Sequence, residues 1–595
     1  MKVLSSRRLL SRIAFGAVSM IALSTGLTAC SNDVANGQTD NKLSGKTAET
    51  IRMAPTPISS QGMVVAANPL AVEAGIDILK EGGSAVDAAI AVQAVLGLVE
   101  PQSSGLGGGA FMVVYDSQNG DVWTYDGRET APSTIGTDLF LGDDGEPIRR
   151  FDGVASGLST GVPGAVVMLE MAHQDYGHIN WGPHFEPALR LAEQGFEISP
   201  RMAGMMARMG RFFLKDQEAA REYFFEADGT TTHPEGFLRD NPLYADTLRA
   251  LQKNPRALLE GRVAEAIITA VQEEPRPGTL TLADMAAYKP LKKPALCSPY
   301  RDYTICGAQP PASGGVAVQS ILGTLQHFDM GAMGPSLEGW HHFIEASFMG
   351  YADRAKYVAD PAFVKVPVKS LLDPTYLKDR AAQIQPDQAL EEISAGDHGP
   401  AGQDATPDNP GTSHFTIMDK DGLVVSMTTT VEAPFGSQRM AGGFMLNNQL
   451  TDFSFRSVDA NGNPIANAPA AGKRPRSSMS PTIVFDKNGK FLFSTGSPGG
   501  NSIIAYTAKT IVGVLDWGLS PQEAIELPNV IARQGRVSIE ESRMDAEMID
   551  GLEAMGHEVR RSRGENSGLH IIYREEDGTL IGGADPRREG VAKGL

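Results

Sequence analysis

The chain has 595 residues, with 52 Lys and Arg residues against 71 Asp and Glu residues, which gives a formal net charge of −19. A protein this acidic is a poor nucleic-acid binder, because phosphate contacts need clustered Lys and Arg side chains. Apolar residues make up 42 % of the chain and charged residues 21 %, close to the values of ordinary globular proteins, so the composition excludes wholesale disorder.

The first 29 residues have the pattern of an export signal. The residues before position 30 include four basic ones and no acidic one, and an apolar run covers residues 13–29. The run ends in Leu27-Thr28-Ala29-Cys30, which resembles the bacterial lipobox, in which the Cys is lipidated and becomes the first residue. Ser31 follows rather than Asp, and by this resemblance the protein is sorted to the outer membrane. We therefore predict a signal peptide over residues 1–29 and a periplasmic protein that contacts the membrane only through a lipid on Cys30.

Residues 30–61 are rich in Ser, Asn, Thr, Gly and Gln, which predicts a flexible tether. Ordered structure should follow, with a first helix over residues 68–83 that begins at an Asn-Pro pair and ends at two glycines. Ser84 and Asp87 have the spacing of a capping box and open a second helix, over residues 84–99. This second helix is apolar nearly all round, so it should be buried.

The rest of the chain alternates between hairpins and a helical middle. Short apolar segments that flank turn sequences predict four hairpins, over residues 110–126, 415–430, 482–495 and 569–581. Residues 155–384 show mainly helical periodicity. Buried helices together with antiparallel hairpins predict an α/β fold in which helices cover sheets.

Two cysteines remain after Cys30, at Cys297 and Cys306, and they flank a predicted hairpin. In an oxidising compartment they could form a disulfide, and two buried free thiols are the alternative. Two ligands do not make a zinc site. His341 and His342 lie near Glu345 on a predicted core helix with no third ligand motif, so we expect no metal.

The boundary between Gly411 and Thr412 is a candidate cleavage site that would expose a nucleophile. Residues 394–411 are rich in Gly, Pro and Asp and predict an exposed loop, which runs directly into the strand that begins at Thr412. A cut at this point would give Thr412 both a hydroxyl nucleophile and a free α-amino group, which titrates near pH 8 and can act as a general base. A hairpin centred between residues 420 and 421 places Thr412 opposite Thr429, with the hydroxyl of Thr430 beside it.

Several motifs, in consistent order over about residues 62–590, resemble those of the γ-glutamyltransferase family. They are Gly105 to Phe111, Arg128-Glu129-Thr130-Ala131-Pro132, Gly411 to Phe415, Thr428 to Gly436, Leu446 to Phe453, Arg474 to Pro481, and Gly496-Ser497-Pro498-Gly499-Gly500. The resemblance implies the N-terminal-nucleophile hydrolase fold, a four-layer αββα sandwich built by two subunits that self-cleavage produces. The large subunit would be residues 62–411 and the small catalytic subunit residues 412–595, held together as a heterodimer.

The resemblance also implies roles for individual residues. Thr412 is the nucleophile, Thr430 orients or activates it, and the backbone of Gly499 and Gly500 forms the oxyanion hole. Arg128 binds the substrate α-carboxylate together with Ser477, and Ser478 lies in the same pocket. Glu432, Gln449 and Asp452 accept hydrogen bonds from the substrate α-ammonium. Some members carry Asn at the position of Glu432, and others carry Glu.

The implied activity is that of a γ-glutamyltransferase and glutathione hydrolase that needs no cofactor. Its substrates would be glutathione and other γ-glutamyl compounds, and its acyl acceptors water, amino acids or dipeptides. Two alternatives stay open. The same scaffold could serve as a cephalosporin acylase or a poly-γ-glutamate depolymerase, although Arg128 and the ammonium pocket argue against the first. A non-catalytic lipoprotein that binds peptides could keep the fold without cutting itself.

Overall fold

The computed structural model describes residues 58–595 apart from residues 211, 213, 407–410 and 563–566. The predicted signal peptide, Cys30 and most of the predicted tether therefore lie outside the described residues. The end of the tether prediction is wrong. Strand β1 (Ile58–Ser59) already pairs with β20 (Leu580–Ala584), with Ile58 opposite Ile581, so sheet structure begins before residue 61.

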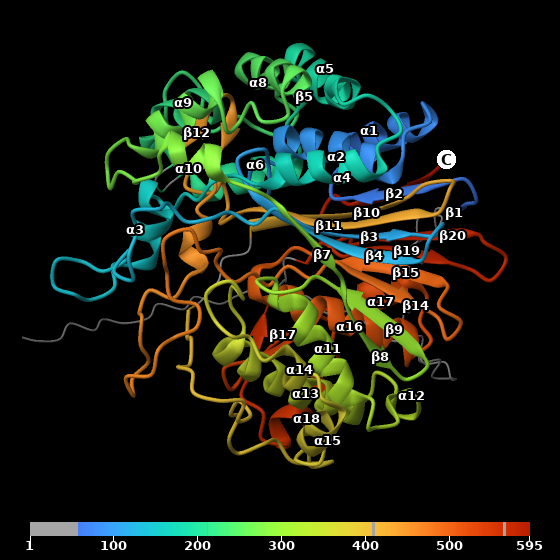
Figure 1. Cartoon of the computed structure of the whole chain (residues 1–595). Coiled ribbons are helices and arrows are strands. Elements are labelled where there is room, and N and C mark those ends of the chain that lie inside the picture. Colours follow the sequence, from blue (N-terminus) through green and yellow to red (C-terminus); the bar gives the residue numbers. More distant parts are fainter. Residues whose placement is uncertain (1–57, 211, 213, 407–410, 563–566) are drawn as a thin grey trace, which may run out of the picture. The chain divides into compact units, whose positions relative to one another are not determined.

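Two seven-stranded sheets form the middle of the fold (Figure 1). The first has the order β21-β2-β10-β11-β3-β4-β7, and we call it the nucleophile sheet because it contains Thr412. Its strands are β2 (Met63–Ala66), β3 (Gly109–Asp116), β4 (Asp121–Asp126), β7 (Leu291–Pro294), β10 (Gly411–Met418), β11 (Leu423–Glu432) and β21 (Val591–Gly594). All its pairings are antiparallel.

The second sheet has the order β1-β20-β19-β15-β14-β9-β8. Besides β1 and β20, its strands are β8 (Leu296–Tyr300), β9 (Tyr303–Gly307), β14 (Thr482–Phe485), β15 (Phe491–Gly496) and β19 (His570–Arg574). Segments from both sides of residue 411 contribute strands to each sheet, so neither side has a complete sheet of its own.

Helices cover the outer face of each sheet (Figure 1). On the nucleophile sheet lie α1 (Pro69–Lys80), α2 (Ala85–Val99), α4 (Ala165–Tyr176), α5 (Glu186–Gln194), α6 (Pro200–Met209), α7 (Glu218–Phe224), α8 (Pro242–Lys253), α9 (Gly261–Val271) and α10 (Leu282–Ala287). On the second sheet lie α11 (Ser313–Leu325), α12 (Met330–Met333), α13 (Leu337–Tyr357), α16 (Ile503–Leu515), α17 (Pro521–Glu526) and α18 (Ala546–Ala554).

The remaining elements are short and lie outside the two main sheets. Helices α14 (Val368–Leu371) and α15 (Pro374–Ala381) are near α11. The other elements are α3 (Arg150–Val154), β5 (Phe196–Glu197), β6 (Leu238–Arg239), β12 (Met440–Ala441), β13 (Phe444–Met445), β16 (Val530–Arg533), β17 (Arg536–Glu540) and β18 (Val559–Ser562).

Apolar side chains fill three layers, which confirms the predicted αββα sandwich. One core lies between the nucleophile sheet and its helices, and another between the second sheet and its helices. A third core lies between the two sheets, where Val65, Phe111 and Val113 pack with Ile483 and Ile572. Side chains that alternate along each strand of the nucleophile sheet thus reach two different cores.

The first two predicted helices are confirmed together with their caps. Asn68 accepts a hydrogen bond from the backbone N–H of Leu70 at the start of α1. Ser84 and Asp87 form the predicted capping box of α2, and every residue of α2 is buried. The four predicted hairpins are also present, as β3–β4, β10–β11, β14–β15 and β19–β20.

The segment before Gly411 differs from the prediction of an exposed loop over residues 394–411. Asp404 is only 3 % exposed, and its carboxylate forms an ion pair with Arg476 at 2.8 Å and accepts a hydrogen bond from Asn467 at 3.1 Å. The backbone N–H of Gly402 donates to the carbonyl of Pro464 at 2.7 Å. The sequence suggested a loop because the segment has no periodicity, but buried polar side chains fasten it without any regular structure.

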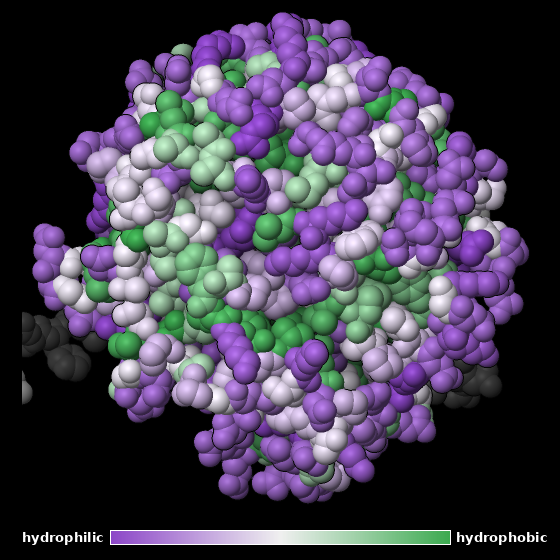
Figure 2. Space-filling view, in the orientation of Figure 1, coloured by the Kyte–Doolittle hydropathy of each residue, from purple (hydrophilic) through white to green (hydrophobic). Residues whose placement is uncertain are grey.

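On the face shown in Figure 2, hydrophilic residues cover most of the helical layers, and apolar residues form smaller patches between them. Among the described residues, no helix has both the length and the apolar character that a membrane crossing requires.

The Asp404–Arg476 pair gives a test of how the segment before Gly411 is held. Burial alone raises the pKa of Asp404, but the Arg476 guanidinium and several hydrogen bonds bring it below the usual value. Asp404→Asn leaves the Arg476 charge uncompensated, which should destabilise the fold by about 3 kcal/mol at pH 7 and lower the apparent Tm by a few degrees. Thermal unfolding followed by circular dichroism measures this.

Asp397→Asn is the matched control, because Asp397 is exposed and, among the described residues, its carboxylate accepts a hydrogen bond only from the nearby N–H of Gly399. The stabilisation by Asp404 is complete above the ordinary Asp pKa of about 4 and is lost as the pH falls through its lower folded-state pKa. The difference between Asp404→Asn and the parent protein should therefore shrink in acid. An equal Tm for the two proteins at pH 7 would contradict this role.

Candidate active site

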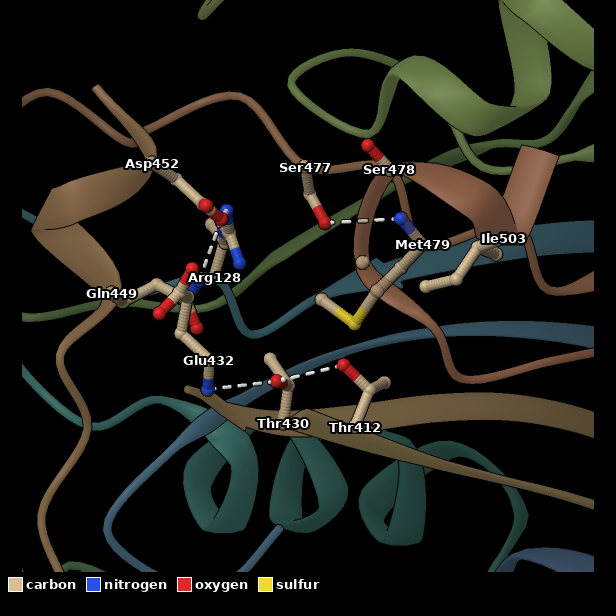
Figure 3. A pocket seen from close by; sticks show the side chains of 11 residues that line it. Arg128, Thr412, Thr430, Glu432, Gln449, Asp452, Ser477, Ser478, Met479 and Ile503 are labelled. Atoms are coloured by element: carbon tan, nitrogen blue, oxygen red, sulfur yellow. Dashed lines mark hydrogen bonds and ion pairs between the residues drawn. The ribbon is translucent and has the colours of Figure 1, made fainter. Parts of the chain in front are cut away.

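Thr412 and Thr430 face each other across the β10–β11 hairpin. The strands pair Thr412 with Thr430, and the two side-chain oxygens are 3.1 Å apart (Figure 3). The predicted register, with Thr412 opposite Thr429, is wrong by one residue. Met418 pairs with Val424, so five residues rather than four separate the last paired positions of the hairpin, and loop length sets the register. The predicted placement of Thr430 beside Thr412 is confirmed.

The hydroxyl of Thr430 sits at the centre of a small hydrogen-bond network. It donates to the backbone carbonyl of Gly411 at 2.5 Å and accepts from the backbone N–H of Glu432 at 2.8 Å. Because its one proton goes to Gly411, its contact with Thr412 must be one in which Thr412 donates. A β-bulge between Gly411 and Thr412 turns the carbonyl of Gly411 toward Thr430. The network therefore joins the Thr412 hydroxyl to the carbonyl of the peptide bond that precedes it.

Arg128 lies at the other end of the same pocket and is fully buried. Its Nε donates to the carbonyl of Pro475 at 3.0 Å, and its Nη2 donates to the carbonyl of Arg476 at 2.7 Å and to Asp452 Oδ2 at 2.5 Å. The two backbone carbonyls fix the guanidinium in one orientation. The two residues expected to bind opposite ends of a substrate zwitterion therefore contact each other directly.

Acceptor groups gather next to Arg128 (Figure 3). Asp452 Oδ2 also accepts from Gln449 Nε2 at 2.8 Å, which directs the amide of Gln449. The other atom of that amide, Gln449 Oε1, is buried and has no hydrogen-bond partner among the described residues. Glu432 is 4 % exposed, and its Oε2 accepts from Asn448 Nδ2. The pocket thus combines carboxylate oxygens with one unused amide oxygen, which suits an ammonium group.

Ser477, Ser478 and Gly500 complete the wall opposite the two threonines. Ser477 Oγ accepts from the N–H of Met479 at 3.2 Å, and Ser478 Oγ donates to Asn501 Oδ1 at 2.8 Å. Gly499 and Gly500 both have a positive φ, +136° and +58°, in the turn between β15 and α16. A Cβ on Gly499 would lie 2.6 Å from the ring of Tyr506, so only glycine fits there.

Eleven residues surround this small pocket. Eight of them are site residues predicted from the sequence, namely Arg128, Thr412, Thr430, Glu432, Gln449, Asp452, Ser477 and Ser478, and the predicted oxyanion-hole residue Gly500 is a ninth. The structure adds Met479 and Ile503, and Gly499 lies next to the lining. Residues from six separate parts of the chain therefore converge on one cavity.

Sequence reasoning missed several residues that hold this pocket in place. Arg354 on α13 donates from Nε to Ser313 Oγ at 2.9 Å and from Nη2 to Ser478 Oγ. Arg588 donates to the carbonyl of Thr412 at 2.8 Å, and burial lowers its pKa to about 9. Asn448 lies within a quoted motif and could have been found there. Nothing in the sequence near Arg354 or Arg588 signals a role.

Burial also changes the charge of Glu129, the neighbour of Arg128. Its side chain is fully buried, and burial raises its pKa to about 8, against the opposing effect of the Arg128 charge. Glu129 is therefore mainly protonated at neutral pH, which leaves the positive charge of Arg128 available to Asp452 or to an anionic ligand.

Two further sequence predictions are decided elsewhere in the structure. Cys297 and Cys306 pair across β8 and β9 and are joined by a disulfide, so the alternative of two buried free thiols is wrong. His341 and Glu345 do have a third potential ligand, His557, which the sequence could not reveal because it is far away along the chain. Both ring nitrogens of His341 already have hydrogen-bond partners, His557 Nε2 at 2.8 Å and the carbonyl of Gln385 at 2.7 Å.

The sequence of the chain is similar to those of known proenzymes. The glutathione hydrolase proenzyme of Escherichia coli strain K12 is 35 % identical over 543 residues, which cover 89 % of this chain and 91 % of that protein. The acylase ACY 1 proenzyme of Pseudomonas sp. strain V22 is 32 % identical over 540 residues, with coverage of 89 % and 93 %.

Solved structures show the same fold. The cephalosporin acylase of Bacillus halodurans superposes with a TM-score of 0.80 at 25 % identity and covers 93 % of this chain and 99 % of its own. The γ-glutamyltranspeptidase of Helicobacter pylori gives a TM-score of 0.54 at 31 % identity, with coverage of 59 % of this chain and 99 % of its own. The γ-glutamyltranspeptidase family profile matches residues 71–595. The chain belongs to the γ-glutamyltranspeptidase family.

Proposed function

We propose that this protein is a self-cleaving γ-glutamyltransferase and glutathione hydrolase in which Thr412 is the nucleophile. One observation carries the proposal: the Thr412 hydroxyl lines the same small cavity as the Arg128–Asp452 ion pair. A γ-glutamyl group has an α-carboxylate and an α-ammonium at one end and the scissile amide at the other, so it needs a charged clamp within reach of a nucleophile. The names of the relatives, glutathione hydrolase proenzymes, support the same activity and a precursor that is processed.

The first reaction is cleavage of the chain itself. Thr412 Oγ1 attacks the carbonyl carbon of Gly411, its proton passes to Thr430, and Thr430 donates its own proton to the Gly411 oxygen. As this intermediate collapses, the proton on the Gly411 oxygen passes to the nitrogen of Thr412 and the C–N bond breaks, which gives an ester between Gly411 and Thr412 and a free α-amino group on Thr412. Water then hydrolyses the ester, which yields subunits of residues 30–411 and 412–595 that remain paired through the shared sheets.

The second reaction uses the new terminus. The α-amino group of Thr412 accepts the hydroxyl proton as Oγ1 attacks the γ-carbonyl carbon of the substrate. The negative oxygen that forms is stabilised by backbone N–H groups of Gly499 and Gly500, at the turn before α16. The amine leaves with a proton, and a γ-glutamyl ester on Thr412 remains. Attack by water gives glutamate, and attack by the amino group of an amino acid or dipeptide gives a new γ-glutamyl amide.

Recognition of the γ-glutamyl group replaces contacts that the residues of the site make with one another. The α-carboxylate replaces Asp452 as the ion-pair partner of Arg128. It also contacts Ser477, and Ser478 lies in the same pocket. Asp452 then turns to the α-ammonium, together with Gln449 Oε1 and Glu432. Each buried charge keeps a partner before and after binding, which avoids the large cost of an unpaired buried ion.

We also propose that the protein is exported and held at the outer membrane by a lipid on Cys30. The basic residues, apolar run and lipobox-like sequence support this location, and a disulfide between Cys297 and Cys306 fits an oxidising compartment. No metal or organic cofactor takes part in the proposed steps, because the nucleophile, base and oxyanion donors all come from the chain.

Thr412→Ala tests the nucleophile. The variant should stay a single polypeptide and show no γ-glutamyl hydrolysis, because both reactions need the hydroxyl. Thr412→Ser keeps a hydroxyl and should still be cut, so it serves as the matched control. Denaturing gels and intact-mass measurement of the purified proteins decide the outcome: cleavage of Thr412→Ala after residue 411 would disprove self-cleavage by Thr412.

Arg128→Ala and Asp452→Ala test the charged clamp. Each should lower kcat/KM for a γ-glutamyl anilide, with a loss of transition-state stabilisation of about 2–4 kcal/mol. One buried charge loses its partner, and a substrate charge loses its contact. Self-cleavage should continue, since neither side chain touches the Gly411–Thr412 peptide in the hydrogen-bond network described above. Steady-state kinetics on the processed variants measure the loss. A kcat/KM near that of the parent for Arg128→Ala would refute the proposed substrate class.

A further inference from the structure

Arg588 contacts the backbone of the proposed nucleophile. It lies between β20 and β21, 176 residues along the chain from Thr412. Its Nη1 donates to the carbonyl oxygen of Thr412 at 2.8 Å, and both residues are buried. Self-cleavage turns the nitrogen of this same threonine into an amino group. A buried guanidinium is therefore bound to the residue that carries the proposed general base.

The guanidinium of Arg588 keeps its positive charge at neutral pH. Burial and the charge of Arg201 lower its pKa, but only to about 9. Four groups influence this charge, namely Arg201, Glu100, Asp585 and Tyr506. Both carboxylates are shared with other cations: Glu100 Oε1 lies 3.7 Å from Arg201 Nε, and Asp585 Oδ1 lies 3.1 Å from Arg587 Nη1. The positive charge of Arg588 is therefore only partly compensated.

This charge acts on the amino group that self-cleavage would release. Two positive charges that lie close together in a poorly screened site repel each other. An α-amino group has an ordinary pKa of about 8, below the pKa of about 9 of Arg588, so the amino group loses its proton before the guanidinium does. The repulsion thus favours the neutral amine, which is the form that can accept a proton from Thr412 Oγ1.

The other charged groups of the pocket do not cancel this repulsion. They are Arg128, Asp452 and Glu432. Arg128 and Asp452 form an ion pair with no net charge. Glu432 attracts a positive charge, but its Oε1 lies 3.6 Å from Nη2 of Arg150, which compensates it. His414, on the same strand β10, is fully buried, and burial lowers its pKa so far that the ring is neutral.

We propose that Arg588 is a positioning residue for the general base: its charge keeps the amino group of Thr412 unprotonated at neutral pH. This inference rests on the proposed function. No bond to Arg588 forms or breaks, because the proton moves from Thr412 Oγ1 to the amino group and then to the leaving amine. In the precursor the same nitrogen belongs to a peptide bond and does not titrate. The charge of Arg588 therefore affects turnover and not self-cleavage.

The experiment measures the pH profile of kcat/KM for γ-glutamyl-p-nitroanilide in the processed parent enzyme, Arg588→Gln and Arg588→Lys. The acid limb of this profile reports the ionisation of the base in the free enzyme. Without the guanidinium the amino group holds its proton to higher pH, so the acid limb of Arg588→Gln should move up by about one pH unit. At acid pH kcat/KM should then fall about tenfold, and at alkaline pH it should approach the parent value. Arg588→Lys keeps the charge and should keep the limb near that of the parent.

Lys593→Met is the matched control. Lys593 lies on β21 of the same sheet, but it is solvent-exposed and pairs with Glu73, so its loss removes one positive charge far less effectively placed than Arg588. Its acid limb should match that of the parent. Self-cleavage into two subunits reports folding in each variant.

A second measurement needs no variant. Competitive labelling of the processed parent enzyme with acetic anhydride at a series of pH values, read by mass spectrometry, gives the pKa of the Thr412 amino group directly. This pKa should lie below the ordinary value of about 8. A value of 8 or higher would overturn the role of Arg588 even where Arg588→Gln does not fold.

The outcomes separate the two proposals. No hydrolysis of γ-glutamyl-p-nitroanilide by the parent enzyme at any pH would refute the proposed function. Normal hydrolysis by the parent with an unshifted acid limb in Arg588→Gln would overturn the inference about Arg588 alone. An equal loss of kcat/KM at every pH would show that Arg588 only supports the structure of β10, and an equal shift in Lys593→Met would show a general charge effect. Either result would also overturn the inference.

Discussion

The position of Thr412 within the nucleophile sheet is the constraint on which the rest of the site depends. Strand β10 pairs with β11 along its whole length and with β2 from Phe415 to Met418, so hydrogen bonds fix its backbone. Arg588 adds a contact to the carbonyl of Thr412. Breaking the peptide bond at Gly411 removes none of these contacts. A new amino terminus made there stays where the hydroxyl already points, so one fixed strand can serve self-cleavage first and acyl transfer afterwards.

Pairing of buried charges sets the recognition chemistry around that strand. Arg128 with Asp452, Arg150 with Glu432 and Arg476 with Asp404 form three ion pairs on adjoining segments. A buried charge without a partner is costly, so a zwitterionic substrate can enter only by exchanging partners with groups already present. We therefore expect the balance among these pairs to influence which acyl groups bind.

Much of the fold and of the site could be predicted from the sequence, because the signals are local. Capping residues located α1 and α2, turn sequences located the hairpins, and motif resemblance identified Arg128 and Thr412. Other features depend on contacts between distant segments. Thr412 pairs with Thr430 rather than with the predicted Thr429 because the hairpin loop is one residue longer than expected. His557 contacts His341 only in the folded chain. The ion pair of Arg150 with Glu432 also joins segments that lie far apart in the sequence.

The central claim is that Thr412, once freed as an amino terminus, carries the γ-glutamyl group. Intact-mass spectrometry of the small subunit tests it most directly, before and shortly after mixing with a γ-glutamyl anilide and quenching in acid. The account predicts a fragment that begins at Thr412 and gains the mass of one γ-glutamyl group, with the added mass located on Thr412 by fragmentation. A small subunit that begins elsewhere, or an acyl group found on another residue, would contradict it.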